Sequence, residues 1–236
     1  MDIEMRIDMG VRGEDGTGID LLKLQEVSAQ KLYRNALMLP EYLSEIPVDF
    51  AENWICVPLP IGRRCTIVSR CGITEARDIN GELLESFESS LPNGSPCMDN
   101  PSRYFCLLDC IQCNAARDSA EYEEPTVYYY VLDMMVWNGI FFYNCSTESR
   151  FWLRDSKLEE LGETLETRAC GRRFANLPSF RCNRKGVSEA INADVGCPLR
   201  GVLFYHAEVE YWPYETPFMC GLPIDKAREL MCSLPT

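Results

Sequence analysis

The sequence predicts an α+β fold dominated by antiparallel sheet, and two patterns lead to this prediction. Short runs rich in aromatic and β-branched residues alternate with stretches containing Gly, Pro and Asn, which is typical of consecutive strands and turns. Two further segments carry leucines at helical spacing. With 236 residues, of which 46% are hydrophobic, the chain is long enough to bury one substantial core.

The chain is expected to begin with an irregular segment followed by a helix. Residues 1–19 are polar, acidic and Gly-bearing, a composition that favours disorder. Asp20 is a suitable N-cap for a helix that carries apolar residues as far as Leu39 and ends before Pro40. The resulting division is a disordered acidic N-terminus at 1–19, a lead-in helical segment at 20–46 and the main domain at 47–236.

The main domain is expected to consist mostly of strands. The runs that predict them are WICVPLP (54–60), RCTIVS (64–69), YFCLLDCIQC (104–113), VYYYVLDMMVW (127–137), FFYNC (141–145), RFWL (150–153) and GVLFYH (201–206). The polar residues 75–102 and 114–126 are expected to be loops between these strands.

Helices and turns complete the expected order of elements. A second helix is expected from Asp155 to about Leu165, because leucines recur there at helical spacing. Residues 211–217 predict a Pro-rich turn region, and residues 223–232 predict a short closing helix. No internal repeat or low-complexity tract interrupts this pattern.

The stretch from Tyr128 to Trp152 is crowded with aromatic side chains on both sides of an Asn138-Gly139 turn. Such a density indicates either a surface that stacks against a flat ligand or an ordinary sheet core. This stretch alone supports both interpretations.

Charge and cysteine content narrow the classes of function. The formal net charge of −13 argues against a broad basic footprint on nucleic acid, so any contact with nucleic acid must be local, and DNA is not an expected partner. The 13 cysteines are odd in number, and no basic-then-apolar leader begins the chain, which indicates a reducing compartment. No apolar stretch has the length of a membrane span, so we expect a soluble protein.

Two catalytic alternatives are weak on chemical grounds. Cys106, Cys110 and Cys113 match an iron–sulfur spacing, but on a strand the first two share one face and the third points the other way. The chain has one histidine, His206, and no GxSxG elbow to pair with it. We therefore expect neither a metal site nor catalytic residues.

Several segments together resemble the snurportin family, whose members bind the trimethylguanosine cap of spliceosomal small nuclear RNAs and act in nuclear import. The segments are WICVPLPIGRRCTIVSRCG, YFCLLDC, YYYVLDMMVWNGIFFYNCSTESRFW with SKLEE, GVLFYH and YWPYETPF, in the family's order from about Leu32 to about Leu222. The resemblance implies two antiparallel sheets with flanking helices, similar to the nucleotidyltransferase domain of mRNA capping enzymes and DNA ligases. It also implies that residues 47–236 form a cap-binding domain.

The same resemblance implies that the chain is not an enzyme. The KxDGxR box of the capping enzymes and ligases falls on residues 59–64, which places Leu59 at the position of the nucleophilic lysine. A leucine has no lone pair that can attack a phosphate, so no covalent nucleotide adduct forms there. Arg200 occupies the acidic position of a later DGxxF-like box, which disfavours a metal, and no cofactor is expected.

A trimethylguanosine cap requires an aromatic face for its cationic purine, an apolar pocket for its doubly methylated amine, and cations for its triphosphate bridge. The aromatic candidates are Trp137, Tyr211 and Trp212. The resemblance implies phosphate or polar contacts at Arg63, Arg64, Ser69, Arg70 and Arg103. We expect these residues to surround an aromatic-walled cleft between the two sheets.

Two departures from the family pattern concern the ligand and the partners. The family's stacking tryptophan is replaced by Gly221, and the family's Arg-rich segment for importin β has no counterpart in residues 1–19. The expected partners are trimethylguanosine-capped small nuclear RNA or its particle, with importin β and an export receptor as further candidates. The expected location is nucleus and cytoplasm, with shuttling between them. The alternative function is a degenerate nucleotidyltransferase-fold module that binds proteins and has weak or no cap affinity.

Overall fold

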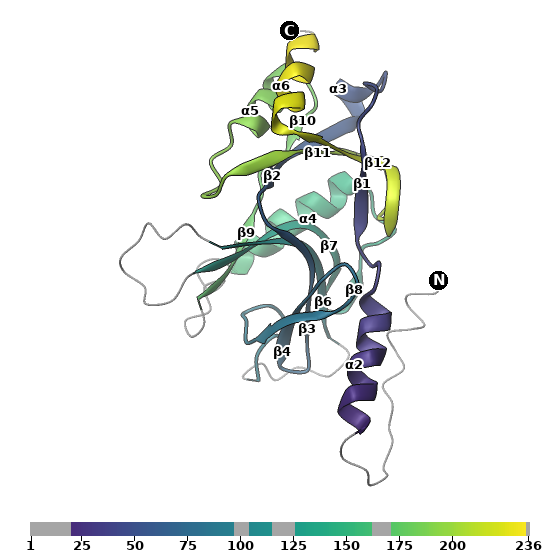
Figure 1. Cartoon of the computed structure of the whole chain (residues 1–236), viewed down its shortest axis with the longest axis vertical. Helices are drawn as coiled ribbons and strands as arrows, with labels where there is room; N and C mark the ends of the chain where they lie inside the picture. The colour runs from purple at the N-terminus through teal and green to yellow at the C-terminus, as the bar shows by residue number, and fades with distance from the viewer. Residues whose placement is uncertain (1–19, 97–103, 115–125, 162–170, 235–236) are drawn as a thin grey trace.

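The computed structural model describes residues 20–96, 104–114, 126–161 and 171–234. Its centre consists of two stacked β-sheets, here called sheet A and sheet B (Figure 1). Sheet A has the strand order β1 (Met38–Tyr42), β12 (Tyr214–Pro223), β11 (Leu199–His206), β2 (Trp54–Pro60) and β10 (Phe180–Arg181). Sheet B has the order β5 (Leu83–Phe87), β4 (Ile73–Arg77), β3 (Arg63–Arg70), β6 (Cys106–Asn114), β7 (Val127–Trp137) and β8 (Ile140–Phe141), and β9 (Arg172–Asn176) also pairs with β7.

The strand pairs are antiparallel except for β1 with β12 and β7 with β9, which are parallel. Side chains alternate between the two faces of a strand, so each sheet presents one set of side chains to the other sheet and a second set to the outside. The two inner faces form one buried apolar cluster, and the outer face of each sheet carries a cluster of its own. The predicted α+β class with two sheets and flanking helices is confirmed.

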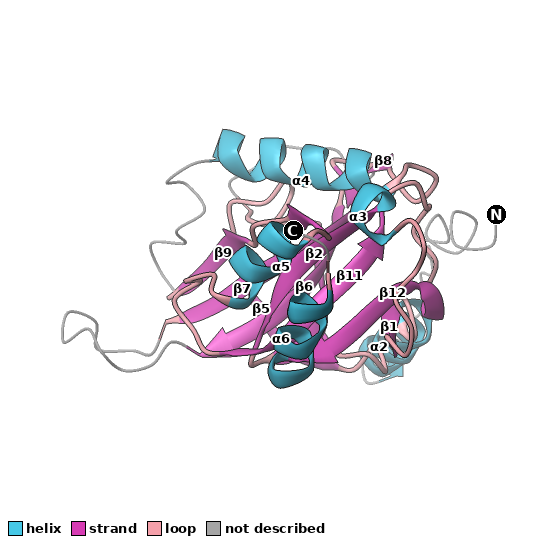
Figure 2. Ribbon diagram, turned by 90° about the horizontal axis from the view of Figure 1, so that it is seen from above, coloured by secondary structure: helices cyan, strands magenta, loops and turns pink. Residues whose placement is uncertain are grey.

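Helices cover the margins and the outer face of sheet A (Figure 2). The described helices are α2 (Asp20–Tyr33), α3 (Phe50–Asn53), α4 (Thr147–Leu161), α5 (Arg184–Ile191) and α6 (Ile224–Ser233). Val187 and Ala190 of α5 and Ala227 of α6 join the outer cluster of sheet A, whereas α4 packs on β7 of sheet B. No helix in the described ranges is long and apolar enough to cross a bilayer.

The lead-in segment differs from its prediction. The helix ends at Tyr33 rather than before Pro40, and Met38–Tyr42 form strand β1. Asn35 takes a left-handed φ of 55° and donates its backbone N–H to the carbonyl oxygen of Ile79, which turns the chain out of the helix. Residues 1–19 lie outside the described part of the chain.

Three other predicted elements are corrected by the structure. Residues 75–102 contain strand pairing, since β4 pairs with β5 within that stretch. The FFYNC strand is limited to Ile140–Phe141, and RFWL lies inside helix α4. Arg150, Arg154 and Leu158 share the buried side of α4 at intervals of four residues, so helical spacing outweighs the aromatic content that suggested a strand.

Candidate functional site

The layer between the sheets is filled by apolar side chains. Val57, Leu59 and Leu203 of sheet A face Val68 and Leu107 of sheet B, and none of these five exposes more than 8% of its surface. The expected open cleft is therefore absent from this part of the molecule. None of the four tryptophans belongs to the inter-sheet cluster, so no indole lines it.

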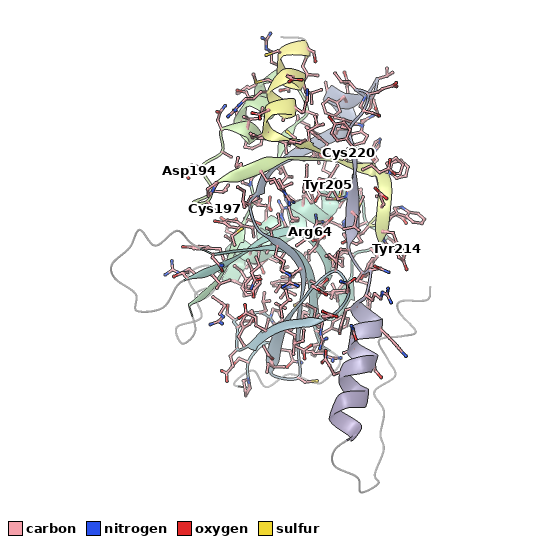
Figure 3. All side chains as sticks on the ribbon, in the orientation of Figure 1. Arg64, Asp194, Cys197, Tyr205, Tyr214 and Cys220 are labelled. Atoms are coloured by element: carbon pink, nitrogen blue, oxygen red, sulfur yellow. The ribbon has the colours of Figure 1, made fainter. Side chains whose placement is uncertain are left out.

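A buried ion pair lies inside this layer. Arg64 donates from Nε to Oδ1 of Asp109 at 2.5 Å and from a terminal nitrogen to Oδ2 at 2.6 Å. Tyr211 donates its hydroxyl to Oδ2 of Asp109 at 2.9 Å and accepts from the backbone N–H of Met38 at 2.8 Å. Arg64 also donates to the carbonyl oxygen of Met38 at 3.0 Å. This bond links strand β1 of sheet A to strand β3 of sheet B. Figure 3 places Arg64 and Tyr205 in this layer from opposite sheets.

The electrostatics of this group keep Arg64 charged. Burial alone would lower the pKa of Arg64, but the negative charge and hydrogen bonds of Asp109 raise it overall. Burial, followed by the charge of Asp109, raises the pKa of Tyr211 well above its usual value, so its hydroxyl remains a donor. Arg64 and Tyr211 are thus both bound to internal partners, Arg64 through Nε and one terminal nitrogen and Tyr211 through its hydroxyl.

A second buried ion pair joins α4 to sheet B. Arg150 donates to both carboxylate oxygens of Asp133 at 3.0 to 3.2 Å, and both side chains are fully buried. Arg154, one helical turn later, donates to the carbonyl oxygens of Leu132 at 2.6 Å and Leu177 at 3.2 Å. These bonds fix the position of α4 against β7.

The predicted phosphate ligands do not gather in one place. Arg63 and Arg70 stand at the two ends of β3, and Ser69 donates to the carbonyl oxygen of Pro92 on the outer side of sheet B. Arg63 is exposed and paired with Asp78 at 3.1 Å. The guanidinium of Arg70 lies 5.9 Å from the ring centre of Tyr33. Arg103 lies outside the described residues.

The aromatic candidates are also dispersed. Trp137 is 8% exposed and belongs to the outer cluster of sheet B, so its ring cannot reach a ligand between the sheets. Trp212 is 55% exposed, immediately after the buried Tyr211. Gly221 faces the inter-sheet layer, and a Cβ built there would lie 3.4 Å from Cδ2 of Leu203 and 3.5 Å from Cβ of Pro40. These are ordinary van der Waals distances, so position 221 has space for a small side chain but carries no ring.

An open pocket lies at the margin of the inter-sheet layer, between α4 and the edge strand β10. Its cavity volume is about 270 Å³, and its lining is Ile55, Glu148, Phe151, Trp152, Asp155, Ser179, Phe180 and Arg181. Ile55 and Phe151 belong to the inter-sheet cluster and form its buried side, whereas Trp152 is 69% exposed. This set is named the Trp152 pocket.

Sequence reasoning missed the Trp152 pocket because it assigned residues 150–153 to a strand. On a helix, Glu148, Trp152 and Asp155 recur at three- and four-residue intervals and so lie along one side. Reasoning also missed the partners of Asp109 and Asp133. The available signal was an aspartate between apolar neighbours in each of two strands, LLDC in β6 and VLDM in β7, because a buried carboxylate requires a cationic partner.

The cysteine geometry agrees with its prediction. Cys106 and Cys110 lie in the outer cluster of sheet B, while Cys113 lies between the sheets. In the described ranges no group of three or more Cys, His, Asp or Glu side chains is arranged to hold a metal ion. His206 ends β11 and packs edge-on against Trp54, with ring centres 5.4 Å apart.

Solved structures with a similar fold include DNA ligases. The mycobacterial DNA ligase D complexed with ATP and MES aligns with a TM-score of 0.53 and 13% identity, over 78% of this chain and 58% of the ligase. The structure named "Pmar-Lig_PreS3" aligns with a TM-score of 0.55 and 10% identity, over 84% of this chain and 50% of its own length. The chain thus spans 58% and 50% of the lengths of these two proteins, and it has a nucleotidyltransferase-type fold.

The sequence assigns the chain to a narrower group of proteins than the fold does. The family described as "Snurportin1, m3G cap-binding domain" matches residues 36–223, from just before β1 to the end of β12. The chain belongs to this family.

Proposed function

We propose that the chain binds the 2,2,7-trimethylguanosine cap of spliceosomal small nuclear RNAs and serves as an adaptor for nuclear import of their particles. The observation that carries the proposal is the family match, which spans both sheets and the two inner faces between them. The proposal includes movement between nucleus and cytoplasm, with importin β and an export receptor as partners.

The proposed function involves no nucleotidyl transfer. Leu59, at the position that the family resemblance equates with the nucleophilic lysine, is 8% exposed and packs in the inter-sheet cluster. An alkyl side chain supplies no nucleophile for attack on a phosphate. Incubation with GTP or ATP and Mg²⁺ should leave the intact mass of the protein unchanged.

A second candidate function is a protein-interaction module with weak or no cap affinity. The filled inter-sheet layer and the glycine at position 221 favour it, because both remove the stacking site that the family pattern leads one to expect. Base stacking on an aromatic ring contributes about 1 to 3 kcal/mol, so its loss without replacement would weaken binding by roughly ten- to a hundredfold.

A titration separates the two candidates. The full chain is titrated with trimethylated, monomethylated and unmethylated cap dinucleotides, followed by tryptophan fluorescence and by calorimetry. Cap binding requires the trimethylated form to bind more tightly than the monomethylated form. Equal or absent binding of both would support the interaction module instead.

A further inference from the structure

We propose that the methylated purine of the cap binds in the Trp152 pocket, on an exposed indole at the β10 edge of sheet A, away from Gly221 on β12. This inference rests on the proposed function and specifies where the base lies. It uses an element outside the two sheets, since Trp152 belongs to helix α4.

The shape of the Trp152 pocket suits a flat ring. The indole of Trp152 is 69% exposed and stands opposite edge strand β10, which contributes Phe180. Ile55 and Phe151 close the inner side and are 7% and 3% exposed. The volume of about 270 Å³ is near the lower end of ligand pockets, about 300 to 1,000 Å³, which fits one base rather than a whole dinucleotide.

Helix α4 is held firmly enough to present Trp152 in a fixed position. Two arginines on the buried side of α4 flank Trp152 in the sequence. Arg150 is bound to Asp133 of β7 by three hydrogen bonds, and Arg154 is bound to the carbonyl oxygen of Leu132. A stacking residue on such a helix does not have to be ordered when the ligand arrives, so less binding free energy is lost.

The polar groups of the pocket do not require a donor from the base. Glu148 is paired with Arg181 at 2.5 Å, and Asp155 is paired with Arg154 at 2.7 Å. Because both carboxylates already accept hydrogen bonds, neither is left unpaired by an exocyclic amine that carries two methyl groups and no proton. Each carboxylate is neutralised by its arginine, so the attraction for the positively charged methylated ring comes from the face of the indole.

One basic residue of the pocket is available to a phosphate bridge. Arg181 lines the pocket, and Arg184 and Lys185 follow it three and four residues later at the start of α5. Arg184 and Lys185 line a separate cavity of about 380 Å³ together with Ser188 and Met231. In a chain with a net charge of −13, residues 181–185 are a local concentration of basic side chains.

The experiment compares two exposed aromatic residues in the full chain. Trp152→Ala and Tyr42→Ala both remove a surface ring, at 69% and 60% exposure, so neither variant leaves a core cavity. The dissociation constant of the trimethylated cap dinucleotide is measured by calorimetry, with circular dichroism as the folding control. We expect Trp152→Ala to raise Kd by about ten- to a hundredfold and Tyr42→Ala to change it by less than about twofold.

A third variant tests the charge of the pocket. Glu148→Gln leaves the cation of Arg181 without its partner in the pocket and should reduce the preference for the trimethylated over the unmethylated dinucleotide, because only the former carries a positive ring. The free trimethylguanosine nucleoside should still bind an Arg181→Gln variant, whereas the dinucleotide should bind it more weakly, because the nucleoside has no phosphate.

The outcomes separate this inference from the proposed function. If the unaltered chain fails to bind the trimethylated cap, the proposed function fails and the inference fails with it. If the unaltered chain binds but Trp152→Ala binds equally well, the function stands and the pocket assignment is wrong. Loss of binding in Trp152→Ala, with the control variant unaffected, supports both the proposed function and the assignment of the base to the Trp152 pocket.

Discussion

Arg64 donates two hydrogen bonds to Asp109, of 2.5 and 2.6 Å, in the layer between the sheets. The neighbouring Arg63 forms a single 3.1 Å contact with Asp78 from the opposite side of the same strand and is exposed. The two arginines therefore have different roles, although they are adjacent in one motif of the sequence. Arg64 is part of the core, and Arg63 belongs to the surface.

Replacing Arg64 should destabilise the fold. Arg64→Gln leaves a buried carboxylate without its cation and should lower the free energy of unfolding by about 3 to 5 kcal/mol. Arg63→Gln removes an exposed pair and should cost less than about 1 kcal/mol. Urea denaturation measures both changes. Equal stability of the two variants would contradict the role assigned to the Arg64–Asp109 pair.

Two buried tyrosines provide a matched test of the hydroxyl bonds. Tyr211→Phe removes a hydroxyl that donates to Asp109 and accepts from Met38, and should cost about 1 to 3 kcal/mol of unfolding free energy. The hydroxyl of Tyr205 has no hydrogen-bond partner among the described residues, so Tyr205→Phe should be neutral or stabilising. Thermal unfolding measures the stability of both variants. A larger loss of stability for Tyr205→Phe than for Tyr211→Phe would contradict the role assigned to the Tyr211 hydroxyl.

Glycines on adjacent strands of sheet A should respond differently to alanine. A Cβ at Gly201 would lie 2.1 Å from the carbonyl oxygen of Leu222, so Gly201→Ala forces a backbone shift and should cost about 1 to 3 kcal/mol. At Gly221 the nearest atom is 3.4 Å away, so Gly221→Ala should change stability by less than about 1 kcal/mol. Chemical denaturation of the two variants is the measurement. If Gly221→Ala lowers the free energy of unfolding more than Gly201→Ala does, position 221 has less space for a side chain than these distances indicate.

The docking of α2 should weaken in acid. Hydrogen bonds and charge from Arg77 lower the pKa of Glu26 below the ordinary value of 4.5. A carboxylate with a lowered pKa contributes stability above its unfolded pKa, and that contribution is lost as pH falls through the folded value. Glu26→Gln should therefore be slightly less stable than the unaltered chain at pH 7, by less than about 1 kcal/mol, and the difference should shrink as the pH falls below 4.5. A stability gap that widens in acid would contradict this sign.

The sequence by itself determined the strand runs that are apolar on both faces, such as 54–60 and 127–137, and the closing helix α6. It also determined which face each thiol of β6 occupies, because alternation along a strand is a local property. Membership of the cap-binding family rests likewise on the order and spacing of motifs along the chain.

Only the tertiary structure decided which charged and aromatic groups are available at the surface. Arg64 was a reasonable phosphate ligand until Asp109, 45 residues away, was found to hold it. The Trp152 pocket combines α4, β2 and β10, which no local pattern brings together. The pairing of buried charges and the formation of a pocket depend on contacts between segments that are far apart in the sequence. The spacing of apolar residues in one segment shows only which of its side chains face the core and which face solvent.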